Sequence, residues 1–237
     1  MKTSLIIPFK NEKYYAALTI RTVYAYLSKQ AIEFEIIAVD DSDDGTWDIL
    51  QTLTHEYPNM ILAKGVQPAG YGTALQVGFQ LATGEIIIPF NGDLSDSLDD
   101  VMSYIHLIEK QGYSMVFGSR FMQGAKVENV TGLKNNISWL ANKFLQLLFI
   151  SPCSDITNSF KGYRKEVLQT LNPSAKGYHI GMELALKGMI SQYRYTTIPI
   201  SWTNRRYGRS KMSVLKVIPD YLLMAFKIRF SQRKNTL

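Results

Sequence analysis

The sequence predicts an α/β protein with a mostly parallel sheet flanked by helices. Short apolar runs alternate with longer amphipathic stretches over residues 4–118, and several of these runs end in polar turns. Strands that alternate with helices of about 10–15 residues are typical of βαβ units. Strands are therefore predicted at 4–8, 35–39, 60–63, 85–90 and 115–118. Helices are predicted at 15–28, 46–57, 72–82 and 98–111.

Three of the predicted strands end in turns that are rich in Asp, Asn or Pro, namely 8–12, 40–46 and 91–96. Ligands of such sheets bind beyond the carboxyl ends of the strands, so the three turns are expected to meet at one edge. The chain has no glycine-rich phosphate loop of the dinucleotide or Walker type. This disfavours NAD and ATP as the main ligands.

After Arg120 the pattern becomes irregular, and two segments are amphipathic, 134–150 and 213–230. Pro219 lies inside the second segment. It is expected to kink or break a helix there, because proline lacks a backbone N–H. Apolar residues at helical spacing are usually core residues, but they also suit helices that lie in a membrane interface. Both interpretations stay open at this point.

The length of 237 residues suits one large domain, or a domain with a short appendage. The single cysteine, Cys153, excludes an intrachain disulfide and favours a reducing compartment. The apolar run at the N-terminus is too short for a signal peptide. No run reaches the roughly 20 apolar residues of a membrane-spanning helix.

The net charge of +6 is unevenly distributed along the chain. From Arg205 to the end there are nine basic residues and one acid, which gives +8 and leaves −2 on the preceding part. A basic tail of this kind suggests an anionic partner: nucleic acid, anionic lipid or a phosphorylated substrate. The acidic balance of the body and the lack of a recognition motif disfavour nucleic acid.

The turn 40–46 places four carboxylates within five positions, at Asp40, Asp41, Asp43 and Asp44. Crowded like charges are costly unless a positive or hydrogen-bonding group uses them. A carboxylate here could accept a hydrogen bond from the ring N–H of a nucleobase. Asp44 precedes Gly45 and suits a structural turn, whereas Asp40 and Asp41 are expected to be functional.

The turn 91–96 carries oxygen side chains at Asn91, Asp93 and Ser95, two residues apart from one another. Such a set could hold Mg²⁺ or Mn²⁺, hard cations that bridge to diphosphate oxygens. The cation would neutralise the charge on a departing nucleoside diphosphate. Turns favour Asn, Gly and Asp in any case, so the pattern alone is weak.

Five segments in this order resemble glycosyltransferase family two, with its GT-A fold. More narrowly, they resemble the branch of dolichol-phosphate mannosyltransferases and polyprenyl-phosphate glycosyltransferases. The segments are Ile-Ile-Pro-Phe-Lys-Asn-Glu (6–12), Val-Asp-Asp-Ser-Asp-Asp-Gly-Thr (39–46), Asn-Gly-Asp (91–93), Gly-Ser-Arg-Phe (118–121) and Gly-Arg-Ser-Lys (208–211).

The resemblance implies a role for each matching residue. Binding of the nucleotide sugar falls to Pro8, Glu12, Asp40, Asp41, Asn91 and Asp93. The metal ligands would be Asn91, Asp93 and Ser95. The lipid-phosphate acceptor would contact Arg120, Lys134, Ser138, Asp155 and Ser159. Catalysis would depend on Asp93, Arg120, Arg205 and Lys211, the last two in a loop that closes over the diphosphate.

Two departures from the family pattern matter. Asn91 replaces the usual first acid, and Ser95 stands where the branch often has Gln, so weaker dependence on Mg²⁺ or Mn²⁺ is expected. Asp96 could supply the missing charge. Members that glycosylate a sugar hydroxyl carry a Glu-Asp pair with a basic Asp, but here Glu183 is followed by Leu184. A phosphate monoester attacks without such a base, so this absence favours a phosphate acceptor.

The resulting hypothesis is a transferase that moves a hexose, with inversion, from a GDP- or UDP-sugar to a polyprenyl phosphate. Residues 1–211 would form the GT-A domain, including an acceptor side at 121–211, and 212–237 a basic amphipathic segment on an anionic membrane surface. The protein would be cytoplasmic and peripheral, with a separate membrane protein as a further candidate partner. Alternatives are a transferase to a sugar hydroxyl with Glu183 as base, and an inactive adaptor that binds sugar nucleotides.

Overall fold

A computed structural model describes residues 1–129, 132–204 and 214–231. Within these residues, a seven-stranded sheet has the order β3-β2-β1-β4-β7-β5-β8. Its strands are β1 (Thr3–Phe9), β2 (Phe34–Asp40), β3 (Met60–Lys64), β4 (Ile86–Pro89), β5 (Met115–Ser119), β7 (Lys161–Arg164) and β8 (Tyr195–Pro199). β7 is antiparallel to both of its neighbours, and the other pairings are parallel.

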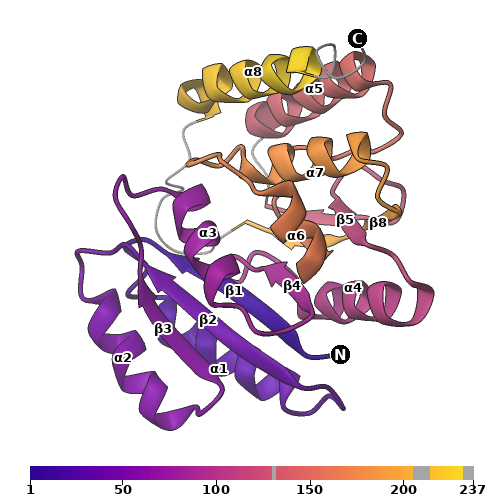
Figure 1. Ribbon diagram of the computed structural model, residues 1–237. Coiled ribbons are helices and arrows are strands. Elements are labelled where there is room, and N and C mark those ends of the chain that lie inside the picture. The colour runs from indigo at the N-terminus through magenta and orange to yellow at the C-terminus, as the bar shows by residue number, and fades with distance from the viewer. Residues whose placement is uncertain (130–131, 205–213, 232–237) are drawn as a thin grey trace.

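Helices cover both faces of this sheet (Figure 1). They are α1 (Ala16–Leu27), α2 (Thr46–Glu56), α3 (Tyr71–Leu81), α4 (Leu98–Gln111), α5 (Gly132–Phe149), α6 (Lys165–Leu171), α7 (Ile180–Ile190) and α8 (Val214–Ser231). A small parallel pair, β6 (Lys126–Glu128) with β9 (Ser201–Thr203), completes the elements. The mixed α/β architecture and the five strands predicted up to residue 118 are confirmed.

The two faces of the sheet follow from the alternation of side chains along each strand. In β1, Leu5 and Ile7 pack into a cluster with α1, α2 and α4, whereas Ile6 packs into a second cluster with α3, α6 and α7. Both faces of the central strands are buried, which explains why these strands read as continuous apolar runs.

The segments α5 and α8 lie side by side, outside α7 and far from α1 and α2 (Figure 1). Helices therefore form at the two predicted segments, near 134–150 and 213–230, and their amphipathic, interfacial character stays a prediction. Of the two expected effects of Pro219, a break was wrong, because α8 runs through it without interruption, and a kink stays a prediction. Pro219 is exposed. Among the described helices, none combines the length and apolarity needed to cross a bilayer.

Candidate functional site

The carboxyl ends of β1 and β2 bring the first two predicted turns together. The pairing of β1 with β2 sets Phe9 opposite Asp40. Beyond the strands, the Asn11 N–H donates to the Ser42 hydroxyl at 2.7 Å, and the Glu12 N–H donates to the Thr46 hydroxyl at 3.0 Å. These bonds hold the backbone of turn 8–12 against turn 40–46, so Pro8 and Glu12 lie at the edge of the sheet where a nucleotide is expected.

Asp40 ends β2 with its side chain fully buried. One carboxylate oxygen, Oδ1, accepts from the Ser42 N–H at 3.2 Å and from its hydroxyl at 2.5 Å. The other, Oδ2, lies 3.7 Å from Lys64 Nζ and has no hydrogen-bond donor among the described residues. A buried oxygen without a donor is rare and costly, so Oδ2 is suited to accept from a bound ligand.

Asp41 lies against the backbone of Gly65. A Cβ atom at Gly65 would be 2.0 Å from Asp41 Oδ1, so any other residue there would displace the Asp41 carboxylate. Burial raises the pKa of Asp41, and the nearby Asp40 adds to the rise, while Lys10 and the Gly70 N–H oppose it. Asp41 therefore also fixes the loop between β3 and α3, a structural task that the sequence did not indicate.

Hydrogen bonds between backbone N–H groups and side chains of the same turn stabilise turn 91–96. The Asn91 N–H donates to Asp96 Oδ2 at 2.9 Å, and the Ser95 N–H donates to Asp93 Oδ1 at 3.2 Å. Asp96 is buried, and its Oδ1 has no donor among the described residues. Burial, reinforced by Asp93 and Asp100 and opposed by the Asn91 N–H and Arg120, raises the pKa of Asp96 to about 8.

A divalent cation fits this turn only in part. Among the described residues there is no group of three His, Cys, Asp or Glu side chains that could hold a metal ion. Asn91, Asp93 and Ser95 offer an amide oxygen, a carboxylate and a hydroxyl. Mg²⁺ is often bound by one or two carboxylates, with the remaining ligands supplied by phosphate and water. The donor set therefore suits a cation that arrives together with a diphosphate.

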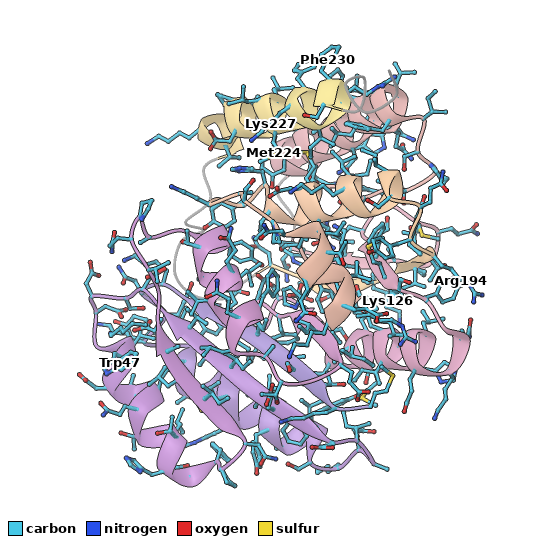
Figure 2. All side chains as sticks on the ribbon, viewed as in Figure 1. Trp47, Lys126, Arg194, Met224, Lys227 and Phe230 are labelled. Carbon is cyan, nitrogen blue, oxygen red and sulfur yellow. The ribbon has the colours of Figure 1, made fainter. Side chains whose placement is uncertain are left out.

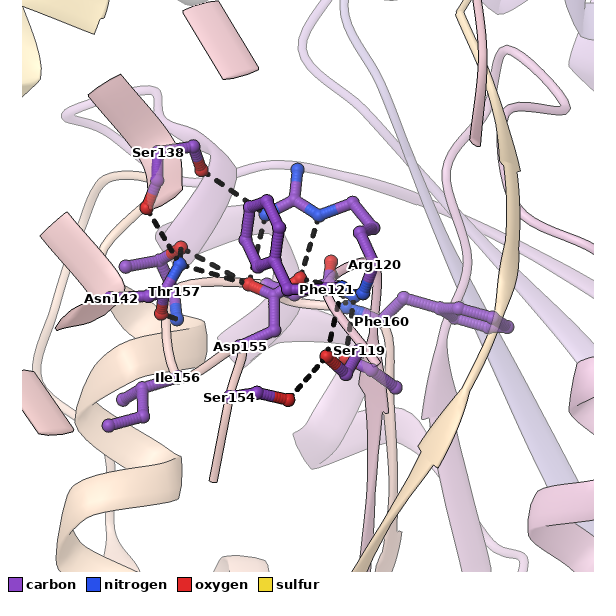
Figure 3. A network of polar contacts seen from close by, with 12 residues as sticks. Ser119, Arg120, Phe121, Ser138, Asn142, Ser154, Asp155, Ile156, Thr157 and Phe160 are labelled. Carbon is purple, nitrogen blue, oxygen red and sulfur yellow. Dashed lines mark hydrogen bonds and ion pairs between the residues drawn. The ribbon is translucent and has the colours of Figure 1, made fainter. Parts of the chain in front are cut away.

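Arg120, at the end of β5, is fixed by the buried carboxylate of Asp155 (Figure 3). The guanidinium donates through Nε to Asp155 Oδ2 at 2.8 Å and through Nη2 to Oδ1 at 3.0 Å. The backbone N–H of Arg120 adds a third bond at 3.1 Å. Burial alone would raise the pKa of Asp155, but Arg120 outweighs this effect and the pKa is lowered. Bidentate pairs of this kind also fix the plane of the guanidinium.

The same cluster reaches helix α5. Ser138 Oγ lies 3.4 Å from Arg120 Nη2. Asn142, one turn further along, donates to Asp155 Oδ1 at 3.2 Å and to the Ser138 carbonyl at 2.9 Å. Three predicted acceptor residues, Arg120, Ser138 and Asp155, are thus in one network. Asn142 belongs to it as well but was missed, since an Asn within an amphipathic segment carries no distinct sequence signal.

Ser159, another predicted acceptor residue, is joined to the donor side by Tyr71 at the start of α3. The Tyr71 hydroxyl lies 2.9 Å from Ser159 Oγ and donates to Asn91 Oδ1 at 3.3 Å. Burial raises the pKa of Tyr71, so the hydroxyl keeps its proton at neutral pH. Tyr71 was also not among the site residues predicted from the sequence. The site thus links the turn at the end of β4 with the segment 154–160.

Comparison with known proteins decides the family. A model of glycosyl transferase family 2 matches residues 4–171, which include each turn and the Arg120–Asp155 cluster. The chain belongs to glycosyl transferase family 2. It is therefore a glycosyltransferase, as the sequence predicted.

Relatives of this family 2 chain include a dolichol-phosphate mannosyltransferase from Pyrococcus furiosus. The two are 30% identical over 96% of this chain and 64% of that enzyme's length. The chain thus spans under two thirds of that relative. A polyprenol monophosphomannose synthase from Mycolicibacterium smegmatis is 28% identical, over 90% of this chain and 81% of the relative.

Among solved structures, glucosyl-3-phosphoglycerate synthase from Mycobacterium tuberculosis, with Mn²⁺, UDP-glucose and phosphoglyceric acid, superimposes with a TM-score of 0.74. The match covers 96% of this chain and 79% of that one at 15% identity. A likeness at this identity establishes the fold, so the expected GT-A fold is confirmed.

The family 2 chain uses Glu183 structurally. This residue, weighed above as a reserve base, is fully buried. Its carboxylate accepts from the N–H groups of Ser174 and Ala175 and pairs with Lys187 at 2.6 Å. Burial alone would raise the pKa of Glu183, but these partners lower it. A buried, paired carboxylate with a lowered pKa is poorly suited to take a proton from a hydroxyl.

The burial of Lys161 on β7 was not predicted from the sequence, because a lysine normally indicates an exposed position. Its side chain is fully buried, and Nζ donates to the Ile156 carbonyl at 3.2 Å. Burial lowers the pKa of Lys161 to about 8, while Cys153 and Asp155 counteract the shift. Cys153 itself is buried, as expected for a small core residue.

Three predicted site residues cannot be placed. Arg205 and Lys211 lie outside the described residues. Lys134 belongs to α5, but its side chain is not among those described. The chain does pass turn 91–96 shortly before Arg205, since the Thr203 N–H donates to the Ser95 carbonyl at 3.0 Å and Trp202 pairs with Asp96.

Proposed function

We propose that this protein transfers a hexose from a nucleoside-diphosphate sugar to a polyprenyl phosphate at a membrane surface. The observation that carries the proposal is the position of Arg120. It is a cation fixed by buried Asp155, beside Ser138 on α5 and close to the segment that contains Ser159. Preoriented cations of this kind bind phosphate and stabilise charge that develops during transfer. The dolichol-phosphate mannosyltransferase and the polyprenol monophosphomannose synthase among the relatives support a transfer of the same class.

The donor would lie across the carboxyl ends of β1, β2 and β4. In this proposal, Asp40 accepts from the nucleobase, and Pro8, Glu12 and Asp41 shape the pocket. Asn91, Asp93 and Ser95 would hold Mg²⁺ or Mn²⁺, which neutralises charge on the diphosphate when bound. Arg205 and Lys211 would close over the diphosphate. The hydrogen bond from the Thr203 N–H to the Ser95 carbonyl in turn 91–96 supports that role, because it brings the chain to this edge just before Arg205.

The acceptor is proposed to be a phosphate rather than a sugar hydroxyl. A hydroxyl must lose its proton during transfer and benefits from a placed base. Glu183, the candidate for that task, is occupied by Ser174, Ala175 and Lys187. A phosphate monoester is already anionic near neutral pH, its second pKa being about 6. An oxygen of such an acceptor could attack the anomeric carbon directly, with inversion, as the bond from that carbon to the nucleoside diphosphate breaks and the diphosphate leaves.

The membrane would be met by α5 and α8, whose outer surface we call the interfacial surface. Ile150, directly after α5, is exposed, and so are several large apolar side chains of the two helices: Trp139, Leu140, Phe144, Leu147, Leu222, Leu223, Phe226 and Phe230. Lys143 and Lys227 are exposed on the same two helices, and Figure 2 labels Lys227 and Phe230 along α8. Apolar and basic residues together suit the interface of an anionic membrane. Residues 212–237 would form the membrane segment and 1–211 the GT-A domain.

We further propose that the protein acts at the cytoplasmic face of its membrane, where the buried free thiol of Cys153 suits the reducing conditions. A separate membrane protein could share the interfacial surface. Nucleic acid is not proposed as a partner, since the exposed basic residues there are interleaved with large apolar ones.

A transfer assay tests the proposal. The full-length protein is mixed with polyprenyl phosphate and labelled GDP- and UDP-sugars, with Mg²⁺, Mn²⁺ or EDTA, and the lipid phase is counted. Label should enter the lipid with one donor and disappear in Asp93→Asn, while the exposed control Asp48→Asn stays active. Label in a sugar acceptor but not in the lipid would overturn the acceptor assignment. Nucleotide binding without any transfer would favour the adaptor.

A further inference from the structure

Tyr71 lies between the two halves of the site. Its hydroxyl is within hydrogen-bond distance of Asn91 on the donor side and Ser159 on the acceptor side, at 3.3 and 2.9 Å. A hydroxyl has one proton to donate and can accept as well. When that proton goes to Asn91 Oδ1, the bond to Ser159 is donated by the serine. A directed chain then runs from Ser159 through Tyr71 to Asn91.

The ring of Tyr71 is held in place from several sides. Tyr178 stacks on it, with centroids 5.1 Å apart and planes inclined by 22°. The Tyr221 hydroxyl, from α8, donates to the Tyr178 carbonyl at 2.9 Å. Next to Tyr71, a Cβ at Gly72 would lie 2.2 Å from the Ala175 carbonyl oxygen, so the first turn of α3 is pressed against that segment. A ring fixed in this way holds its hydroxyl at a defined position, so the hydroxyl can orient a neighbouring side chain.

Asn91 is the residue for which such control matters. Its side-chain amide has an oxygen on one side and an NH₂ group on the other, and only the oxygen can ligate a cation. A carboxylate at this position would have two equivalent oxygens and would need no such control. An amide here therefore creates a requirement for orientation that the neighbouring hydroxyl can meet.

We propose that Tyr71 is a positioning residue, which orients the Asn91 amide so that its oxygen faces the cation that accompanies the donor diphosphate. The inference rests on the proposed donor site, but not on the identity of the acceptor. It assigns to Tyr71 a role that this chain needs because its turn begins with an amide rather than a carboxylate.

The test is a double-mutant cycle on Mn²⁺ binding. Free and bound Mn²⁺ are measured by electron paramagnetic resonance, with GDP or UDP present and no acceptor. Tyr71→Phe should weaken Mn²⁺ binding by about two- to tenfold, the effect of one uncharged hydrogen bond. Asn91→Asp should strengthen binding. Adding Tyr71→Phe to Asn91→Asp should then cost little, because a carboxylate offers oxygen in either orientation.

A matched control is available in Tyr163→Phe, which removes a buried hydroxyl that has no hydrogen-bond partner among the described residues. It should leave Mn²⁺ binding unchanged. Equal losses from Tyr71→Phe in the wild-type and Asn91→Asp backgrounds would show a general structural role and overturn the inference. So would unchanged binding in Tyr71→Phe, or no Mn²⁺ binding by the wild type with either diphosphate. If the cycle behaves as expected but no sugar is transferred, only the proposed function fails.

Discussion

Arg120 and Asp155 show how a single pair of side chains can define an anion site. Burial of a lone charge costs several kcal/mol in practice, and here the two charges meet through two hydrogen bonds. Asn142 and Thr157 also contact Asp155 Oδ1, so the carboxylate is well saturated. The guanidinium is thereby fixed before any acceptor arrives.

Arg120→Lys tests the importance of that fixed geometry. Lysine keeps the charge but cannot form the bidentate pair with Asp155. Transfer to polyprenyl phosphate should fall by about ten- to a hundredfold, with most of the loss in the apparent affinity for the acceptor. Steady-state kinetics with varied acceptor measures this effect. The control is Arg21→Lys, which alters an exposed pair with Glu56; wild-type kinetics in Arg120→Lys would remove Arg120 from the acceptor site.

Among the described elements, α5 and α8 have outer faces that remain uncovered. Leu147 on α5 is 82% exposed and Leu223 on α8 is 72% exposed, while Ile150 directly after α5 is 90% exposed. Their inner faces pack on the body through Leu145, Ala225 and Ile228. Because the inner faces are buried, the apolar groups of the outer faces form an exposed patch. Such patches mark sites that bind another protein or a membrane, which is why the interfacial surface is proposed to meet lipid.

Leu223→Glu should weaken binding to vesicles that contain anionic lipid by about tenfold or more, because burial of a leucine is worth roughly 1.5–3 kcal/mol. Co-sedimentation with the vesicles measures the effect. Leu18→Glu serves as the control, since Leu18 is 55% exposed but lies on α1, at the other end of the molecule. Binding should also weaken as salt is raised. Equal losses in both variants would contradict a specific interfacial surface.

The elements also show what a sequence can and cannot predict. The strands β1, β2, β4 and β5 were predicted because they are buried on both faces and read as apolar runs. The edge strand β3 is only half-buried, but its short apolar run was also found. β7 was missed because it contains Lys161 and Arg164, and α7 because it is apolar all around, with Glu183 buried. The turns of the site were predicted from their acids. Tyr71 and Asn142 were not, since their roles arise only from contacts between distant segments.

At the scale of the whole molecule, a buried carboxylate near the N-terminus ties three segments together. Glu35 on β2 pairs with Lys2 at 2.6 Å and accepts from Ser4 and from the N–H of Thr83. Burial by itself would raise the pKa of Glu35, but Lys2, Ser4 and Thr83 outweigh it and lower the pKa to about 2. The carboxylate therefore stabilises the fold above its ordinary pKa of 4.5, and this contribution is lost as the pH falls toward 2.

Glu35→Gln should lower the free energy of unfolding by about 3 kcal/mol at neutral pH and by only about 1 kcal/mol near pH 3. Urea denaturation of both proteins at the two pH values measures this difference. Glu56→Gln, which affects an exposed pair, should change stability by less than about 1 kcal/mol at either pH. A deficit in Glu35→Gln that does not shrink in acid would show that packing, rather than charge, accounts for the effect.

The place of β7 in the sheet bears on the order in which the protein is made. β4 ends at Pro89, yet β7, its neighbour on the side away from β1, begins only at Lys161. As the chain leaves the ribosome, the strands β3, β2, β1 and β4 can assemble early, but the edge of β4 keeps unpaired backbone groups that attract other strands. Synthesis must reach Arg164 before the chain itself can cover that edge, so shorter nascent chains leave these backbone groups of β4 open to pairing with other strands.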